Sequence, residues 1–172
     1  MTASRRDPAE LETILDYRFR DDSVLIRALT HSSLKKTGSD PSYERLEFLG
    51  DRVLGLIVAE LLIEQFPDSP EGKLAPRLAA LVSGSTLADV SRTLGLGDFI
   101  RMTDGEAAAG TNDRASVLAD CCEAVIGAVY RDGGLEAATT LVRRFWEPLV
   151  ETVEPNVAKT ELQEWAQGRG LP

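Results

Sequence analysis

Helical periodicity runs through almost the whole chain and constrains its fold more than any other feature. Apolar residues recur at helical spacing over 43–66 and again over 115–130, and no segment shows the strict alternation of a half-buried strand. The other predicted helices begin at Asp7 and Asp21 or span 73–82, 85–94 and 135–150. We therefore expect an all-α helical bundle.

The predicted helices are separated by ordinary breaking signals. Residues 103–112 are rich in Gly and Ala without a clear period, which predicts a loop. Asp132-Gly133-Gly134 predicts the end of one helix, and Pro148 predicts an interruption near the end of the next.

Composition narrows the class of protein. The 172 residues carry 19 Lys and Arg against 28 Asp and Glu, a net charge of −9, with apolar runs far too short for a spanning helix. The length suits one domain with a short appendage, and no apolar stretch near the start resembles a secretory signal. We expect no membrane partner. A pI near 4.7 also argues against binding nucleic acid by general electrostatics, unless the acids are concentrated in a special site.

The cysteines and the histidine indicate no zinc or disulfide chemistry. Cys121 and Cys122 are adjacent, so they cannot form an ordinary disulfide in a helix, and His31 is the only histidine. A reducing, cytoplasmic setting fits this pattern. We interpret His31 as structural and both cysteines as small core residues rather than nucleophiles.

Acidic residues occur inside the two most apolar helices. Glu44, Glu47 and Asp51 are spaced i, i+3, i+7 and share one helix face, while Asp120 and Glu123 are spaced i, i+3. Carboxylates on a buried face repel each other and are costly to desolvate unless they are paired or bound to a metal.

Two explanations remain open at this point. Arg45, Arg52 or Arg114 could neutralise the carboxylates in buried salt bridges. Alternatively, the two helices pack together and pool their carboxylates in one acidic pocket, whose oxygen-only donors suit Mg²⁺ or Mn²⁺ and assist phosphoryl transfer.

Several segments of the chain resemble motifs of one protein family, and they occur in the same order as in that family. Residues 43–51, Tyr-Glu-Arg-Leu-Glu-Phe-Leu-Gly-Asp, closely resemble the signature of the ribonuclease III family of double-strand-specific RNA endonucleases. Residues 118–130 resemble the second acidic helix of that family, and shorter matches fall at 28–33, 71–74 and 132–134. The resemblance extends from about residue 10 to about residue 150.

The resemblance implies an all-helical endonuclease domain that forms a two-fold homodimer with one acidic cluster in each subunit. Position by position, the residues that match the catalytic, metal-binding carboxylates are Glu47, Asp51, Asp120 and Glu123. Glu44 and Glu71 match supporting acidic positions. Phe48 matches an aromatic dimer contact, although an ordinary core phenylalanine is the alternative.

The implied reaction is the hydrolysis of double-stranded RNA, such as ribosomal RNA precursors, with Mg²⁺ as cofactor and Mn²⁺ as a substitute. The products would carry 5′-phosphate and 3′-hydroxyl ends with short 3′ overhangs. Recognition would depend on the shape of A-form RNA rather than on its sequence. A non-catalytic RNA-binding or dimerisation scaffold on the same fold is the alternative.

The sequence departs from the family pattern at three places. Residues 110–114 lack the usual Gly-Gly-Arg-x-Asn arrangement, and Arg52 stands where a small residue is common, facing either a carboxylate or solvent. Residues 1–152 are expected to form the nuclease domain, and 153–172 a linker with the first helix of a truncated RNA-binding domain. A metal pocket on a truncated chain would reconcile the negative charge with an RNA substrate.

Overall fold

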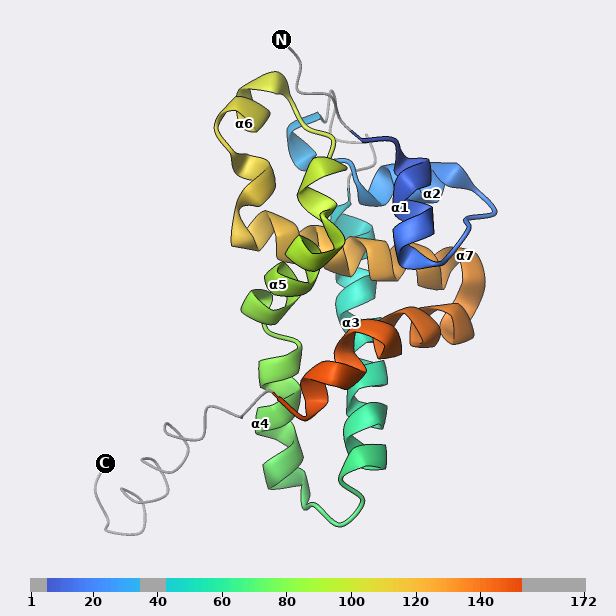
Figure 1. The fold of residues 1–172 in the computed structure, drawn as a ribbon, viewed down its shortest axis with the longest axis vertical. Helices are drawn as coiled ribbons and strands as arrows, with labels where there is room; N and C mark the ends of the chain where they lie inside the picture. The colour runs from blue at the N-terminus through green and yellow to red at the C-terminus, as the bar shows by residue number, and fades with distance from the viewer. Residues whose placement is uncertain (1–5, 35–42, 153–172) are drawn as a thin grey trace, which may run out of the picture.

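The computed structural model describes residues 6–34 and 43–152, and these form a helical bundle (Figure 1). The elements are α1 (Pro8–Leu15), α2 (Asp22–Ala28), η1 (Ser32–Leu34), α3 (Glu44–Gln65), α4 (Glu71–Leu81), α5 (Gly84–Leu94), η2 (Leu96–Asp98), α6 (Asp104–Ala108), η3 (Thr111–Asp113) and α7 (Ala115–Val150). Within the described ranges there is no strand, and the extended contact between Thr30 and Arg101 is an isolated bridge. The all-α prediction is confirmed. The expectation for 153–172 lies outside the described residues.

Side-chain caps fix the starts of three helices. Asp7 and Glu10 form a reciprocal capping box at α1, with Pro8 in the first turn. Asp21 accepts a hydrogen bond from the Ser23 backbone N–H at α2, and Ser83 accepts one from Thr86 at α5. These side-chain oxygens satisfy backbone N–H groups that would otherwise be unpaired. Each of the three helices begins within one residue of its predicted start.

Two predictions about loops and breaks are wrong. Residues 103–112 are not a continuous loop, because they contain α6 and the beginning of η3, and the Thr111 hydroxyl donates to Glu106 across this segment. Pro148 does not interrupt α7, which continues to Val150. A proline this close to a helix end removes few backbone hydrogen bonds, so the last turn can persist.

Helix α7 consists of two helical segments joined at Gly134. This glycine has φ 82° and ψ −172°, a conformation open to glycine and rarely to other residues, so the chain changes direction there as the sequence predicted. Just before the kink, Asp132 accepts hydrogen bonds from the Tyr17 hydroxyl at 2.6 Å and from the backbone N–H groups of Arg20 and Asp21. Asp132 thereby ties the link between α1 and α2 to the end of the first segment.

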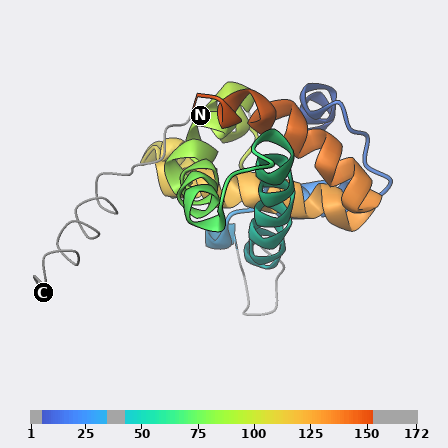
Figure 2. The same ribbon diagram turned by 90° about the horizontal axis from the view of Figure 1, so that it is seen from below.

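The core is built around α3 and α7. Helices α3 and α4 run antiparallel side by side, and the first segment of α7 crosses α3 near its N-terminal end (Figures 1 and 2). Leu54, Ile57 and Leu61 of α3 are almost fully buried, as is Trp146 of α7, whose indole N–H donates to the Leu81 carbonyl at 2.9 Å. Every helix in the described part of the chain is too short or too polar to cross a bilayer.

Candidate acidic active site

The site is formed where α3 crosses the first segment of α7. Gly50 of α3 and Gly127 of α7 make this crossing unusually close, because a Cβ added to Gly50 would overlap the Glu123 carbonyl. A Cβ on Gly127 would likewise overlap the Leu46 carbonyl. The two backbones therefore touch at a point flanked by Glu47 and Asp51 on one helix and by Asp120 and Glu123 on the other.

The carboxylates beside this crossing influence one another electrostatically. Burial, together with the negative charges of Glu47 and Asp120, raises the pKa of Glu123 to about 7, and Arg52 only partly offsets this rise. Burial followed by Asp120 and Glu44 raises the pKa of Glu47. Burial also raises the pKa of Asp120, against a smaller opposing effect of His31. The two helices thus share one region that is deficient in positive charge.

Asp51 differs from these three carboxylates because it has an arginine partner. Arg52 forms an ion pair with Asp51, and the two side chains are 66% and 40% exposed. The pair therefore lies at the surface and is not the buried salt bridge that the sequence left open. Arg52 pairs with a site carboxylate while facing solvent.

The remaining acidic candidates lie apart from each other. Glu44 is exposed in the first turn of α3, and its charge contributes to the raised pKa of Glu47. Glu71 begins α4, beyond the opposite end of α3. From Glu47 to the end of α3 at Gln65 is about 27 Å along the helix axis. Glu71 is therefore not brought to the crossing within one subunit.

The carboxylates at the crossing are the type of ligand that a hard divalent cation prefers. All its side-chain donors are carboxylate oxygens, and three of the carboxylates are partly buried with raised pKa values. However, among residues 6–34 and 43–152 no three Asp, Glu, His or Cys side chains converge closely enough to form a ready-made metal site. The residues therefore fit a divalent cation in the type of their donor atoms and in their position on two adjoining helices. To bind an ion, their side chains would have to rotate toward it.

Three further residues lie at the site although the sequence predicted no role for them: Tyr43, Gly50 and Gly127. Tyr43 is buried directly before α3, and burial, followed by the charge of Asp120, raises its pKa. Glycines in the middle of two otherwise apolar helices were the available signal, because glycine is unfavourable there unless a backbone approaches closely.

His31 and the two cysteines have surroundings that agree with structural roles. The His31 ring lies edge-on to Tyr43, with 5.8 Å between ring centroids, and its Nδ1 accepts a hydrogen bond from Ser33. Cys121 and Cys122 are fully buried free thiols. Burial raises the pKa of Cys122 to about 12 and also raises that of Cys121, which keeps both thiols protonated and unreactive.

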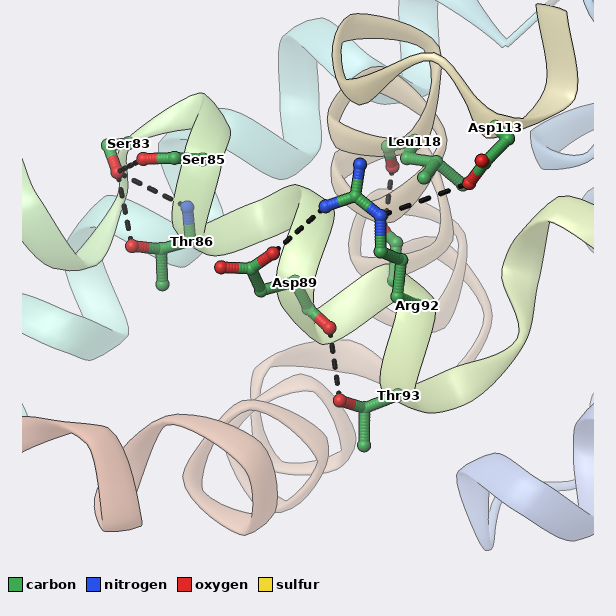
Figure 3. Close-up of polar contacts among 9 residues, drawn as sticks. Ser83, Ser85, Thr86, Asp89, Arg92, Thr93, Asp113 and Leu118 are labelled. Atoms are coloured by element: carbon green, nitrogen blue, oxygen red, sulfur yellow. Dashed lines mark hydrogen bonds and ion pairs between the residues drawn. The ribbon is translucent and has the colours of Figure 1, made fainter. Parts of the chain in front are cut away.

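The divergent segment 110–114 is held by contacts within the chain. Asn112 donates to the Gly97 carbonyl at 3.2 Å. Arg92 of α5 lies between Asp89 and Asp113, with an Nε to Oδ1 distance of 3.9 Å to Asp113 (Figure 3). On the same helix, Ser91 donates to the Leu118 carbonyl, which fixes the start of the acidic helix against α5. The contacts of Asn112 and Asp113 position this segment against α5 and η2.

Phe48 and two other apolar residues of α3 point away from the core. Phe48, Leu56 and Ile63 are 68%, 58% and 61% exposed, and their spacing places them on one side of the helix together with Arg52 and Gly55. We call these five residues the outer face of α3. Phe48 is therefore not a core residue of this chain, which excludes that alternative.

The protein is thus an all-helical domain in which carboxylates from two helices lie beside the point where those helices cross. Comparison with known proteins identifies the family. A family model described as ribonuclease-III-like matches residues 21–149, and the chain belongs to this family.

The relatives named Ribonuclease 3 are similar over nearly the whole chain. The protein from Rhodopseudomonas palustris is 51% identical over 98% of this chain, which spans 63% of that relative's length. The protein from Azorhizobium caulinodans is 48% identical, with 97% and 73% covered. Among solved structures, the nuclease domain of ribonuclease III from Campylobacter jejuni has a TM-score of 0.78 and 43% identity, covering 83% of this chain and 97% of its own.

Proposed function

We propose that the chain is the nuclease part of an endoribonuclease that hydrolyses phosphodiester bonds in both strands of an RNA duplex. The observation that carries this proposal is the pooling of Glu47, Asp120 and Glu123 at the glycine-mediated crossing, where each carboxylate has a raised pKa. Family membership and the name of the relatives, Ribonuclease 3, point to the same activity.

Each carboxylate has a definable part in this proposal. Glu47, Asp51, Asp120 and Glu123 would hold Mg²⁺, or Mn²⁺ in its place, and a bound ion supplies an activated water and stabilises charge on the reacting phosphate. Glu123 has the most perturbed carboxyl of the cluster in the metal-free protein, with a pKa of about 7, and a bound cation would favour its charged form. Glu44 would support Glu47 from the neighbouring turn.

The proposed products carry 5′-phosphate and 3′-hydroxyl ends with short 3′ overhangs, and ribosomal RNA precursors are a proposed substrate. Recognition would rely on the shape and the 2′-hydroxyl groups of the duplex. A cytoplasmic location belongs to the same proposal and is consistent with two free thiols. The assignment of 1–152 to the nuclease and 153–172 to the start of an RNA-binding domain likewise stays a prediction.

We further infer that the active form is a two-fold homodimer through the outer face of α3. Phe48 and Ile63 lie at nearly equal distances along the helix from Leu56, so an antiparallel pairing centred near Leu56 would set Phe48 against Ile63 of the partner subunit. The same pairing would bring the partner's Glu71 toward the acidic cluster that Glu71 of its own subunit cannot reach. The solved C. jejuni nuclease domain is described as having a region involved in dimer formation.

Cleavage of labelled duplex RNA at low salt in Mg²⁺ or Mn²⁺ tests the proposed activity. Glu123→Gln keeps the shape of the side chain and is expected to reduce turnover at least a hundredfold while the dimer persists. Exposed Glu60→Gln, on the opposite half of α3, is the matched control and should keep full activity. Binding of duplex RNA without cleavage by the wild type at high protein concentration would favour the non-catalytic scaffold instead.

A further inference from the structure

Arg52 occupies a position between the acidic site and the outer face of α3. Its guanidinium Nη1 pairs with Oδ2 of Asp51. The centre of the same guanidinium lies 5.4 Å from the centroid of the Phe48 ring, which is within the range of a cation–π contact. One side chain therefore contacts both a site carboxylate and the most exposed apolar residue of the outer face.

Arg52 makes this contact without being buried. Its side chain is 66% exposed while it pairs with Asp51, so the cation lies on the solvent side of the acidic site.

We propose that Arg52 is the resident counter-cation of the acidic site, which a divalent ion must displace from Asp51. The inference rests on the proposed function and adds a positioning residue to it. In the metal-free protein the guanidinium holds the Asp51 carboxylate and reduces repulsion within the cluster. On ion binding no covalent bond changes, because the Asp51 carboxylate only exchanges one cation for another.

This exchange has a definite sign. An arginine that must give up its carboxylate opposes metal binding, both by competition and by the repulsion between its charge and the ion. The pair is largely exposed, so the effect is moderate. Loss of Arg52 should therefore tighten metal binding, whereas loss of a ligand would weaken it.

Titration calorimetry with Mn²⁺ alone, on metal-free protein, tests the inference directly. Arg52→Ala is expected to bind Mn²⁺ about two- to fivefold more tightly than the wild type, in line with the modest strength of an exposed pair. Arg52→Lys keeps the charge without the planar guanidinium and should bind with intermediate affinity.

Arg77→Ala is the matched control. Arg77 also stacks on a phenylalanine, 4.5 Å from the Phe66 ring centroid, but it lies on α4 at the far end of α3. The same loss of charge there should leave Mn²⁺ affinity unchanged. Circular dichroism verifies that each substitution leaves the fold intact.

The outcomes separate this inference from the proposed function. Equal or weaker Mn²⁺ binding by Arg52→Ala, with measurable binding by the wild type, would overturn the role of Arg52 and leave the metal site standing. Tighter binding by Arg77→Ala to the same degree would also overturn it, because only net charge would then matter. Failure of all the proteins to bind Mn²⁺ would overturn the metal site and the role of Arg52 together.

Discussion

Helix α3 presents two apolar faces that differ in what covers them. On the inner face, Gly50 lies so close to α7 that a methyl group would overlap a backbone carbonyl. On the outer face, a Cβ on Gly55 would meet nothing within 4 Å, and Phe48, Leu56 and Ile63 are mostly exposed. The same kind of apolar sequence therefore stabilises the fold of the subunit on one side of α3 and, by our proposal, its assembly on the other.

The largest expected effect is that of Gly50→Ala. The new methyl group would overlap the Glu123 carbonyl, and a backbone group cannot move aside as a side-chain end can. We expect a loss of about 3 kcal/mol or more in the free energy of unfolding, at the upper end for overpacking, measured by denaturant titration. Because the crossing also sets the spacing of the carboxylates, the folded fraction should cleave RNA poorly. A loss below about 1 kcal/mol would show that the helices can separate easily.

Phe48→Ala should affect assembly rather than the fold of the subunit. Since the ring is 68% exposed, little stability of the monomer depends on it, but an aromatic interface residue typically contributes about 1 kcal/mol or more, and a two-fold dimer loses two copies of it, about 2 kcal/mol in all. The dissociation constant of the dimer should rise by roughly 30-fold in sedimentation equilibrium experiments. Leu135→Ala is the control, because Leu135 is 47% exposed on α7 and lies outside the outer face. If Leu135→Ala dissociates the dimer and Phe48→Ala does not, the interface lies elsewhere.

Glu123→Gln should change how stability depends on pH in the absence of metal. The pKa of Glu123 is about 7 in the folded protein and near 4.5 without the surrounding structure, so the folded state holds its proton over this interval while the unfolded state releases it. The protonated Glu123 carboxyl therefore contributes to the free energy of unfolding in full below pH 4.5, and this contribution is lost as the pH rises through 7.

The expected loss for the wild type over this pH range is on the order of 1 kcal/mol, reduced from the full pKa shift because the group is only about half buried. Denaturant titrations at several pH values should give a flatter profile for Glu123→Gln. The slope should not vanish, since the pKa values of Glu47 and Asp120 are raised in the same direction. Identical slopes for both proteins would contradict the coupling of carboxylates across the crossing.

The smallest expected effect is that of Gly55→Ala on the outer face. With open space around it in the subunit, alanine should raise helix stability by up to about 1 kcal/mol. Thermal unfolding at low protein concentration measures this gain. A large loss that appears only at high protein concentration would show that the partner's helix packs as closely at Gly55 as α7 packs at Gly50.

Most of the helices, and the acidic residues on the two crossing helices, could be predicted from local sequence patterns. Capping residues such as Asp7 and Asp21, and a break at Gly134, are local signals that the backbone follows without help from distant segments. The failures were equally local: the segment 103–112 has weak intrinsic preference, and contacts such as that of Thr111 with Glu106 are what organise it.

Which of these residues lie close together depends on how the helices pack. Spacing put Glu47 on one helix and Glu123 on another, but their mutual effect depends on the contact between Gly50 and the backbone of α7. Likewise, the sequence could not tell whether Arg52 faced a carboxylate or solvent, or whether Phe48 belonged to the core, and the structure answers both. The physical reason is that periodicity reports which side of a helix is apolar, whereas burial and charge depend on what is packed against that side.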